Sequence, residues 1–284
     1  MRKQRQIYFF LPNFSTGGAG NSIFNICDAI KGKWKSINVI CIGKNYYKKR
    51  LNKIGVNVIE LKKKKTIFGI IEIYFLLKKI SFKNDIIFIS NINYTNVLSI
   101  IFLRNIKNLK IIITERTPLQ ELELYFNFIE LIKKKIILYL AKLIYKKADY
   151  VIGNSKKVTL DIKFKLGVKA KTIYPIIKLD KFDKKKFNKI LNILWIGRDS
   201  PEKNLDDFLK SINLLRNEKF VVNIVSDKDV RSKVYNIISK NFIKKINFFK
   251  FNQNKNFLRK IYLNSDVYVN TSLYEGFPNT MVDA

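Results

Sequence analysis

The feature that most constrains the fold of this 284-residue chain is a repeated alternation of short β-branched runs with longer segments of helical periodicity. The short runs are almost entirely apolar and are bounded by turn-forming or charged residues, which is typical of strands buried in a parallel sheet. Apolar residues recur at helical spacing between them, as in 23–30 and 67–80. This alternation predicts right-handed βαβ units and an α/β fold of doubly wound parallel sheets. We expect the first strands at 7–11, 37–42, 56–61, 86–90, 110–113 and 150–153.

The alternation is interrupted by a segment that begins near Pro175, is rich in lysine and lacks a sustained apolar face. Such a segment is typical of a linker between domains. The pattern predicts an N-terminal Rossmann-like domain at 1–174, a linker at 175–190 and a C-terminal Rossmann-like domain at 191–284. The last domain has strands expected at 191–196, 220–225, 246–251 and 267–270, with helices at 204–215, 230–239 and 256–263. It is shorter than the usual ~100–150 residues, so we expect the chain to be truncated within it.

The composition excludes several classes of protein. The chain has no histidine, which excludes a Ser-His-Asp hydrolase, a Cys-His protease and a His-ligated zinc site. Lys+Arg 55 against Asp+Glu 22 gives a net charge of +33, but only nine of the 55 are arginine. Nucleic-acid binding usually needs arginine and a motif that presents it to base edges, and the sequence has no such motif. We therefore expect no nucleic-acid partner. Most of the positive charge is explained by an A+T-rich coding sequence, which supplies many lysine codons. Attraction of this charge to anionic lipid remains an alternative.

No stretch of the sequence predicts a membrane span. The longest uncharged apolar stretch, 86–103, carries six polar residues and is expected to form a strand, a loop and a helix. The apolar run 7–11 is too short for the core of a signal peptide. We expect a cytoplasmic protein. Segment 122–147 mixes apolar clusters with lysine pairs, so it is either a long packed helix or a basic amphipathic helix that lies on anionic lipid.

A glycine-rich turn follows the first predicted strand. Gly17, Gly18 and Ala19 open the next predicted helix, where backbone amides can approach a phosphate or a sugar closely. The glycine spacing does not match a dinucleotide-binding fingerprint. The alternative is a tight turn capped by Ser22.

A second turn follows the first strand of the C-terminal domain. Gly197 ends the strand, Arg198 lies at its carboxyl end, and Lys203 comes five positions later near the next helix. Ligands of open α/β sheets bind at the carboxyl ends of the strands. The two cations could therefore converge on one diphosphate, although an ordinary loop in a lysine-rich protein would have the same sequence.

A third constellation lies near the end of the sequence. Glu275 precedes a Gly-Phe-Pro run, and Asp283 comes eight positions later. If a helix begins near Asn279, Glu275 lies in the loop before it and Asp283 about one turn inside it. Helix capping is the alternative role for these acids, but an acid followed by a glycine, an aromatic residue and a proline favours a functional loop.

Together these motifs resemble those of the retaining glycosyltransferases of family 4, which have the GT-B fold of two facing Rossmann-like domains. Two further segments are similar to the family's patterns, Ala148–Ser155 and Ile173–Phe182. The resemblance runs through nearly the whole chain. Its most specific parts are Gly197-Arg198 to Lys203 and Ser272 to Asn279.

The resemblance implies a role for each residue of the C-terminal motifs. Arg198 and Lys203 would bind the diphosphate of a nucleotide-sugar such as a UDP-sugar, and Glu275 would stabilise the transferred sugar. Asp283 would bind the ribose, although the family has the longer glutamate there. Main-chain amides would hold the phosphate and the sugar hydroxyls at Gly276, Phe277, Asn279 and Thr280, with Gly197 in the turn beneath them.

The implied mechanism needs neither histidine nor metal, because the departing phosphate can accept the proton and the two cations replace a magnesium ion. We therefore expect no cofactor. Glu115 and Arg116 follow the strand at 110–113 and are candidates for the acceptor site, or form a local ion pair.

The sequence thus predicts a retaining hexosyltransferase that moves a sugar from a nucleotide-sugar to a glycan or a polyprenyl-linked acceptor. Its expected role is cell-surface polysaccharide biosynthesis, such as lipopolysaccharide or capsule, on the cytoplasmic face of a bacterial membrane. The alternatives are a nucleotide-sugar epimerase of the same fold, and an inactive fragment or basic membrane- or nucleic-acid-binding protein.

Overall fold

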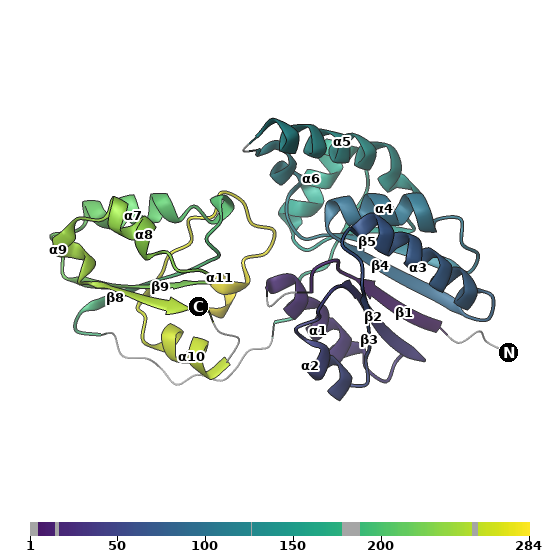
Figure 1. The fold of residues 1–284 in the computed structure, drawn as a ribbon, viewed down its shortest axis with the longest axis horizontal. Helices are drawn as coiled ribbons and strands as arrows, with labels where there is room; N and C mark the ends of the chain where they lie inside the picture. The colour runs from purple at the N-terminus through teal and green to yellow at the C-terminus, as the bar shows by residue number, and fades with distance from the viewer. Residues whose placement is uncertain (1–4, 15–16, 126, 178–187, 252–254) are drawn as a thin grey trace. The chain divides into compact units, whose positions relative to one another are not determined.

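The computed structural model describes residues 5–14, 17–125, 127–177, 188–251 and 255–284. The chain forms two compact units, Met1–Lys178 and Leu179–Ala284 (Figure 1). Much of the predicted linker, 178–187, lies outside the described residues. Each unit is built on its own parallel sheet, as the alternation of the sequence predicts.

The first unit contains a seven-stranded parallel sheet in the order β3-β2-β1-β4-β5-β6-β7. Strand order reverses between β1 and β4, so the connections leave these two neighbours in opposite directions across the sheet. In open α/β sheets this reversal marks the point where ligands bind. The strands are β1 Arg5–Phe10, β2 Ser36–Ile42, β3 Asn57–Leu61, β4 Asp85–Asn91, β5 Leu109–Glu115, β6 Tyr150–Gly153 and β7 Lys171–Thr172.

Helices cover both faces of this sheet because successive strand residues point to opposite sides. On β1, Ile7 and Phe9 pack against helices α1 (Gly18–Ile30) and α2 (Lys48–Lys53). Tyr8 and Phe10 belong to the core on the other face. That core is completed by α3 (Thr66–Ser81), α4 (Asn93–Leu103), α5 (Phe128–Ile144) and α6 (Lys156–Leu166).

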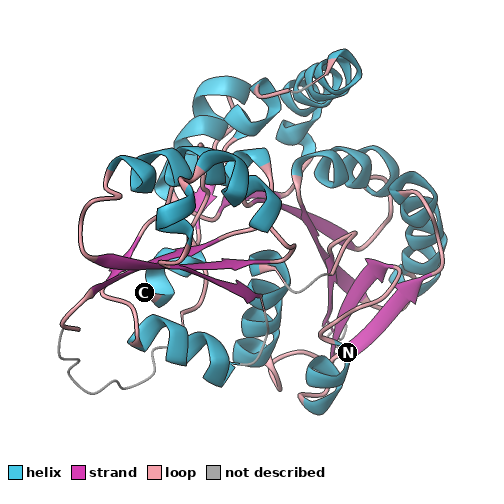
Figure 2. Cartoon of the chain, turned by 60° about the vertical axis from the view of Figure 1, so that its left-hand side comes forward, coloured by secondary structure: helices cyan, strands magenta, loops and turns pink. Residues whose placement is uncertain are grey.

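The second unit has a four-stranded parallel sheet in the order β10-β9-β8-β11, with helices on both sides (Figure 2). Trp195 of β8 packs with α7 and its neighbours, whereas Leu194 and Ile196 pack on the opposite face with α10. The strands are β8 Leu191–Ile196, β9 Phe220–Ser226, β10 Ile246–Lys250 and β11 Val267–Tyr268. The helices are α7 Leu205–Leu214, α8 Arg231–Ile237, α9 Lys240–Ile243, α10 Lys255–Leu263 and α11 Asn279–Asp283.

Three predicted helices are shorter or divided in the structure. Segment 122–147 contains the end of a 3-10 helix, η1 (Leu119–Glu123), then α5, then a second one, η2 (Tyr145–Lys147). The α-helix starts late because the Asn127 side chain accepts a hydrogen bond from the Glu130 amide and caps it. Asn204, with φ +51°, separates the short 3-10 helix η3 (Pro201–Lys203) from α7. Segment 230–239 is also divided, since α8 ends at Ile237 and α9 begins at Lys240.

The stretch 86–103 forms β4 and α4, which confirms its interpretation as strand and helix. None of the helices within the described ranges combines the length and the apolar character that crossing a bilayer would require.

Candidate active site

Gly197 directs the chain out of the sheet of the second unit. Its amide donates a hydrogen bond to the Val225 carbonyl at 3.1 Å, which continues the ladder between β8 and β9 for one more residue. A Cβ atom at this position would lie 2.6 Å from the ring of Trp195, a contact that no ordinary side chain tolerates. Because glycine has no side chain, the backbone at Gly197 can pass close to the indole of Trp195. Arg198 follows directly and lies at the carboxyl end of β8.

The loop after Arg198 is bound to the loop that follows β11, the neighbouring strand. The Leu273 amide donates to the Glu202 carbonyl at 2.9 Å. The single hydrogen of the Thr271 hydroxyl is shared between the carbonyls of Lys203 and Asn204, at 3.0 and 2.9 Å, and the hydroxyl accepts a hydrogen bond from the Trp195 indole at 3.1 Å. These bonds join two motifs that lie about 70 residues apart in the sequence.

The charged side chains of the two loops meet at this edge of the sheet. Lys203 forms an ion pair with Glu275, and both side chains are about one-fifth exposed, at 21% and 24%. Ser272 donates a hydrogen bond to the same Glu275 oxygen at 2.9 Å. Arg198 pairs with Glu202 at 2.8 Å, and its own side chain is 68% exposed. Each predicted cation thus lies beside one carboxylate.

The remaining predicted residues of this unit lie on the same loop and on α11. Gly276 is buried, Asn279 begins α11, and Asp283 ends it, as expected. Thr280 anchors the helix: its hydroxyl shares a hydrogen bond of 2.7 Å with Tyr268, and its carbonyl accepts one of 3.1 Å from Tyr262. Burial raises the pKa of both tyrosine hydroxyls, and the charge of Asp283 adds to this effect.

The alternative in which Glu275 caps a helix is wrong. The residue that precedes α11 is Pro278, which provides no side-chain cap, and the Glu275 carboxylate pairs with Lys203 instead. The residues that hold the two loops together were not predicted from the sequence: Trp195, Glu202 and Thr271. Their partners lie far away in the sequence, so no local pattern identifies them.

In the first unit, Gly17 precedes α1 and Gly18 begins it; both are exposed, and Ala19 is half-buried. Ser15 and Thr16 of the same turn lie outside the described residues. Ser22 is buried within α1, so the alternative in which it caps this helix is wrong. The position before the helix is occupied by Gly17.

Glu115 and Arg116 have different partners. Glu115 is 1% exposed, and its carboxylate accepts hydrogen bonds from the Asn96 amide at 2.9 Å and from the Tyr145 hydroxyl. Burial raises the pKa of Glu115 to about 7, although both hydrogen bonds oppose this shift. Arg116 instead donates from Nε to the side-chain oxygen of Asn91 at 3.0 Å. The alternative in which these two described neighbours form a local ion pair is therefore wrong.

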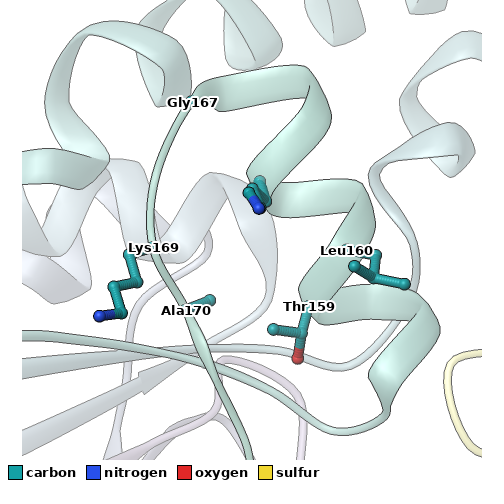
Figure 3. Close-up of a pocket in the computed structure, with 6 residues that line it drawn as sticks. Thr159, Leu160, Gly167, Lys169 and Ala170 are labelled. Atoms are coloured by element: carbon teal, nitrogen blue, oxygen red, sulfur yellow. The ribbon is translucent and has the colours of Figure 1, made fainter.

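A hollow of about 420 Å³ lies elsewhere in the first unit (Figure 3). It lies against α6 and the segment that follows it, and no predicted site residue lines it. Its lining residues are Thr159, Leu160, Lys163, Gly167, Lys169 and Ala170. Among the residues that the structure describes, no group of three or more aspartate, glutamate or cysteine side chains could hold a metal ion.

The comparison with protein families matches the unit that contains the Lys203–Glu275 pair. Residues 177–284 match the family described as "Glycosyl transferases group 1". The chain is also 27% identical over 165 residues to a Klebsiella pneumoniae protein, the "Uncharacterized 41.2 kDa protein in cps region". The alignment covers 54% of this chain and 44% of that protein, so the chain spans less than half of this curated relative.

Solved structures resemble the chain over nearly its whole length. Anabaena HepE in complex with UDP and glucose has a TM-score of 0.72 and 16% identity, covering 98% of this chain and 77% of that one. The lipopolysaccharide outer core galactosyltransferase WaaB has a TM-score of 0.69 and 17% identity, covering 99% and 77%. A variant of S. aureus TarM in a complex that includes UDP has a TM-score of 0.72 and 14% identity, covering 98% and 83%. These likenesses confirm the predicted GT-B fold.

Proposed function

We propose that this chain is a glycosyltransferase that moves a sugar from a nucleotide-sugar, such as a UDP-sugar, to a glycan or lipid-linked glycan acceptor. The observation that carries the proposal is the Lys203–Glu275 ion pair, held at the carboxyl edge of the sheet by the hydrogen bonds of Thr271 and Leu273. The family match covers the same residues. HepE, which has a similar fold, was crystallised with UDP and glucose.

The two cations supply the electrostatic part of the reaction. A diphosphate gains negative charge as the sugar departs, and fixed cations stabilise that charge most effectively in the transition state. In the proposed reaction the diphosphate binds Arg198 and Lys203 in competition with Glu202 and Glu275. Glu275, once released from Lys203, faces the transferred sugar and stabilises the positive charge that develops on its ring.

The other residues of the site bind the rest of the donor. Asp283 contacts the ribose, and Gly197 gives the diphosphate access to the turn. Main-chain groups hold the phosphate and the sugar hydroxyls at Gly276, Phe277, Asn279 and Thr280. We infer a retaining reaction without a metal ion, in which the leaving phosphate oxygen takes the proton of the acceptor hydroxyl. The first unit contributes to acceptor binding through the glycine-rich turn at Gly17–Ala19 and through Arg116, which Glu115 adjoins.

We infer a role in cell-surface polysaccharide synthesis on an anionic membrane surface. The relative from the cps region supports the first part. Helix α5 supports the second, because apolar side chains recur every three or four residues along one exposed face, at Ile129, Ile132, Ile136, Tyr139 and Leu143. Exposed lysines flank this face at Lys133, Lys135, Lys142, Lys146 and Lys147. Apolar side chains flanked by lysines are typical of helices that bind anionic lipid.

Release of UDP from a panel of UDP-sugars, in the presence of bacterial membrane extract as the acceptor source, tests this function. We expect Glu275→Gln to lower turnover by about 100- to 1,000-fold, as for the loss of one electrostatic group in an active site. Arg216→Ala, which removes an exposed arginine from the same unit, should retain full turnover. Equal turnover by the wild type and Glu275→Gln would contradict the role of this pair. Conversion of the donor to its epimer without UDP release would favour the epimerase alternative.

A further inference from the structure

Arg116 lies one strand away from the point where the strand order of the first unit reverses, between β1 and β4. Asn91 ends β4, and Arg116 directly follows β5, the next strand of the sheet. The Asn91 side chain also donates a hydrogen bond of 3.0 Å to the Phe10 carbonyl at the end of β1. Arg116 is therefore tied to the carboxyl ends of β1 and β4, where open α/β sheets bind their ligands.

Two asparagines fix Arg116 from both sides. Asn91, which is 1% exposed, accepts the Nε hydrogen bond of the guanidinium at 3.0 Å. Asn154, after β6, donates to the Arg116 carbonyl at 2.8 Å. The backbone and the first nitrogen of the guanidinium are thus held in place. The two Nη groups are the remaining donors, and they form the fork with which arginine binds phosphate or carboxylate.

No acidic residue compensates the charge of Arg116 within the described part of the chain. The neighbouring Glu115 carboxylate is bound by Tyr145 and Asn96, and no ion pair is formed with Arg116. Burial lowers the pKa of Arg116 to about 10, and no carboxylate offsets this shift. Arg116 is half-buried. Removing part of a cation from water without an anionic partner is costly, so an anion from outside the chain would relieve the cost.

We propose that Arg116 forms an anion-binding site in the first unit and binds a phosphate or diphosphate group. That this group belongs to the acceptor rests on the proposed function; the anion site itself does not. A phosphate group can accept hydrogen bonds from both Nη groups at once. The Nε bond to Asn91 would keep the guanidinium in the orientation that presents them.

The test measures binding of inorganic pyrophosphate by calorimetry in an Arg198→Ala/Lys203→Ala background, which removes the proposed donor site. Moderately high salt screens the exposed lysines. We expect Arg116→Gln to weaken pyrophosphate binding at least tenfold. The matched control Arg104→Gln, at an exposed arginine of the same unit, should change it less than twofold. Unchanged pyrophosphate binding by Arg116→Gln would overturn the proposal.

A second measurement separates a binding role from a structural one. Without added anion, Arg116→Gln should raise the Tm, because it removes an uncompensated cation while Asn91 keeps its hydrogen bond of 2.7 Å from Thr114. A structural arginine would lower the Tm when removed, and this result would argue against the proposal. If Arg116→Gln does not fold, Arg116→Lys serves instead: it keeps the charge but loses the fork, so its pyrophosphate affinity should also fall.

The source of the phosphate is distinguished with farnesyl diphosphate. Tighter binding of farnesyl diphosphate than of pyrophosphate, abolished by Arg116→Gln, would assign the site to a lipid-linked phosphate. Equal binding of both, abolished by the same change, would assign it to a soluble phosphate. UDP binding that survives Arg198→Ala/Lys203→Ala would count against the donor site of the proposed function but not against the Arg116 site.

Discussion

Glu115 is a buried acid of the first unit, 1% exposed. It is the last residue of β5. Its carboxylate contacts Tyr145 and Asn96, which are both fully buried. Both residues donate hydrogen bonds to it. Burial outweighs these bonds and raises the pKa of Glu115 to about 7, so protonated and ionised carboxyls are both present in the folded state near neutral pH.

This environment predicts a pH dependence of stability. The folded pKa of about 7 lies above the ordinary value of 4.5, so the contribution of Glu115 is fully present below pH 4.5 and is lost as the pH rises through 7. One pKa unit corresponds to about 1.4 kcal/mol, which makes the loss of the order of 3 kcal/mol. Glu115→Gln should remove this loss and be more stable than the wild type above pH 7, as measured by urea unfolding between pH 4 and 9.

The control is Glu72→Gln on α3, where the glutamate side chain is 47% exposed. Its unfolding free energy should follow the wild-type pH profile. Parallel profiles for the wild type and Glu115→Gln would contradict the raised pKa.

Among helices and strands, periodicity predicted most of the elements but not their side-chain partners. Except for β7, which was not predicted, the strands of both sheets were predicted to within two residues, because buried parallel strands are continuous apolar runs. The pairing of Glu115 with Tyr145 joins residues 30 positions apart, and that of Arg116 with Asn91 joins residues 25 apart. These contacts depend on strand register and helix packing. One local signal did exist. Every second residue of β5 points to the same face of the sheet, so Glu115 lies on the buried face that Ile111 and Ile113 occupy.

The candidate donor site was predictable only in part. Arg198, Lys203 and Glu275 were identified from their motifs, and the structure brings Lys203 and Glu275 together. The bonds that join the two loops come from Trp195 and Thr271, which have no distinctive spacing. Tertiary packing of β8 beside β11 creates this cluster, and single-sequence patterns do not reveal which strands become neighbours.

The exposed apolar face of helix α5 predicts binding to anionic lipid. Ile136 and Tyr139 are 53% and 64% exposed, and their face points away from the core to which Ala141 belongs. Ile136→Asp should weaken binding to phosphatidylglycerol vesicles several-fold, because it places a negative charge where the apolar face meets anionic lipid. Cosedimentation measures this effect. Tyr235→Asp on α8 removes an equally exposed ring from the second unit and should bind vesicles like the wild type; equal loss in both variants would contradict a specific role for α5.

At the scale of the whole molecule, the functional groups are divided between two units. The second unit holds the Arg198, Lys203 and Glu275 cluster, and it is the unit matched by the glycosyltransferase family. The first unit holds Arg116 and the exposed face of α5. The net charge of +33 favours every anionic ligand without selectivity. Binding at a specific site must therefore be distinguished from this non-selective attraction. Pairs of variants that each remove one positive charge, one inside the proposed site and one outside it, make this distinction.

Calorimetric titration with UDP measures whether Arg198 binds the diphosphate of the donor. We expect Arg198→Ala to weaken UDP binding by about 10- to 100-fold, because hydrogen bonds to charged groups contribute about 1.5–3 kcal/mol. Arg216→Ala, which removes the same charge from the same unit, should leave the affinity unchanged. If both variants bind UDP as the wild type does, or if both lose affinity equally, Arg198 does not bind the diphosphate and the proposed donor site is wrong.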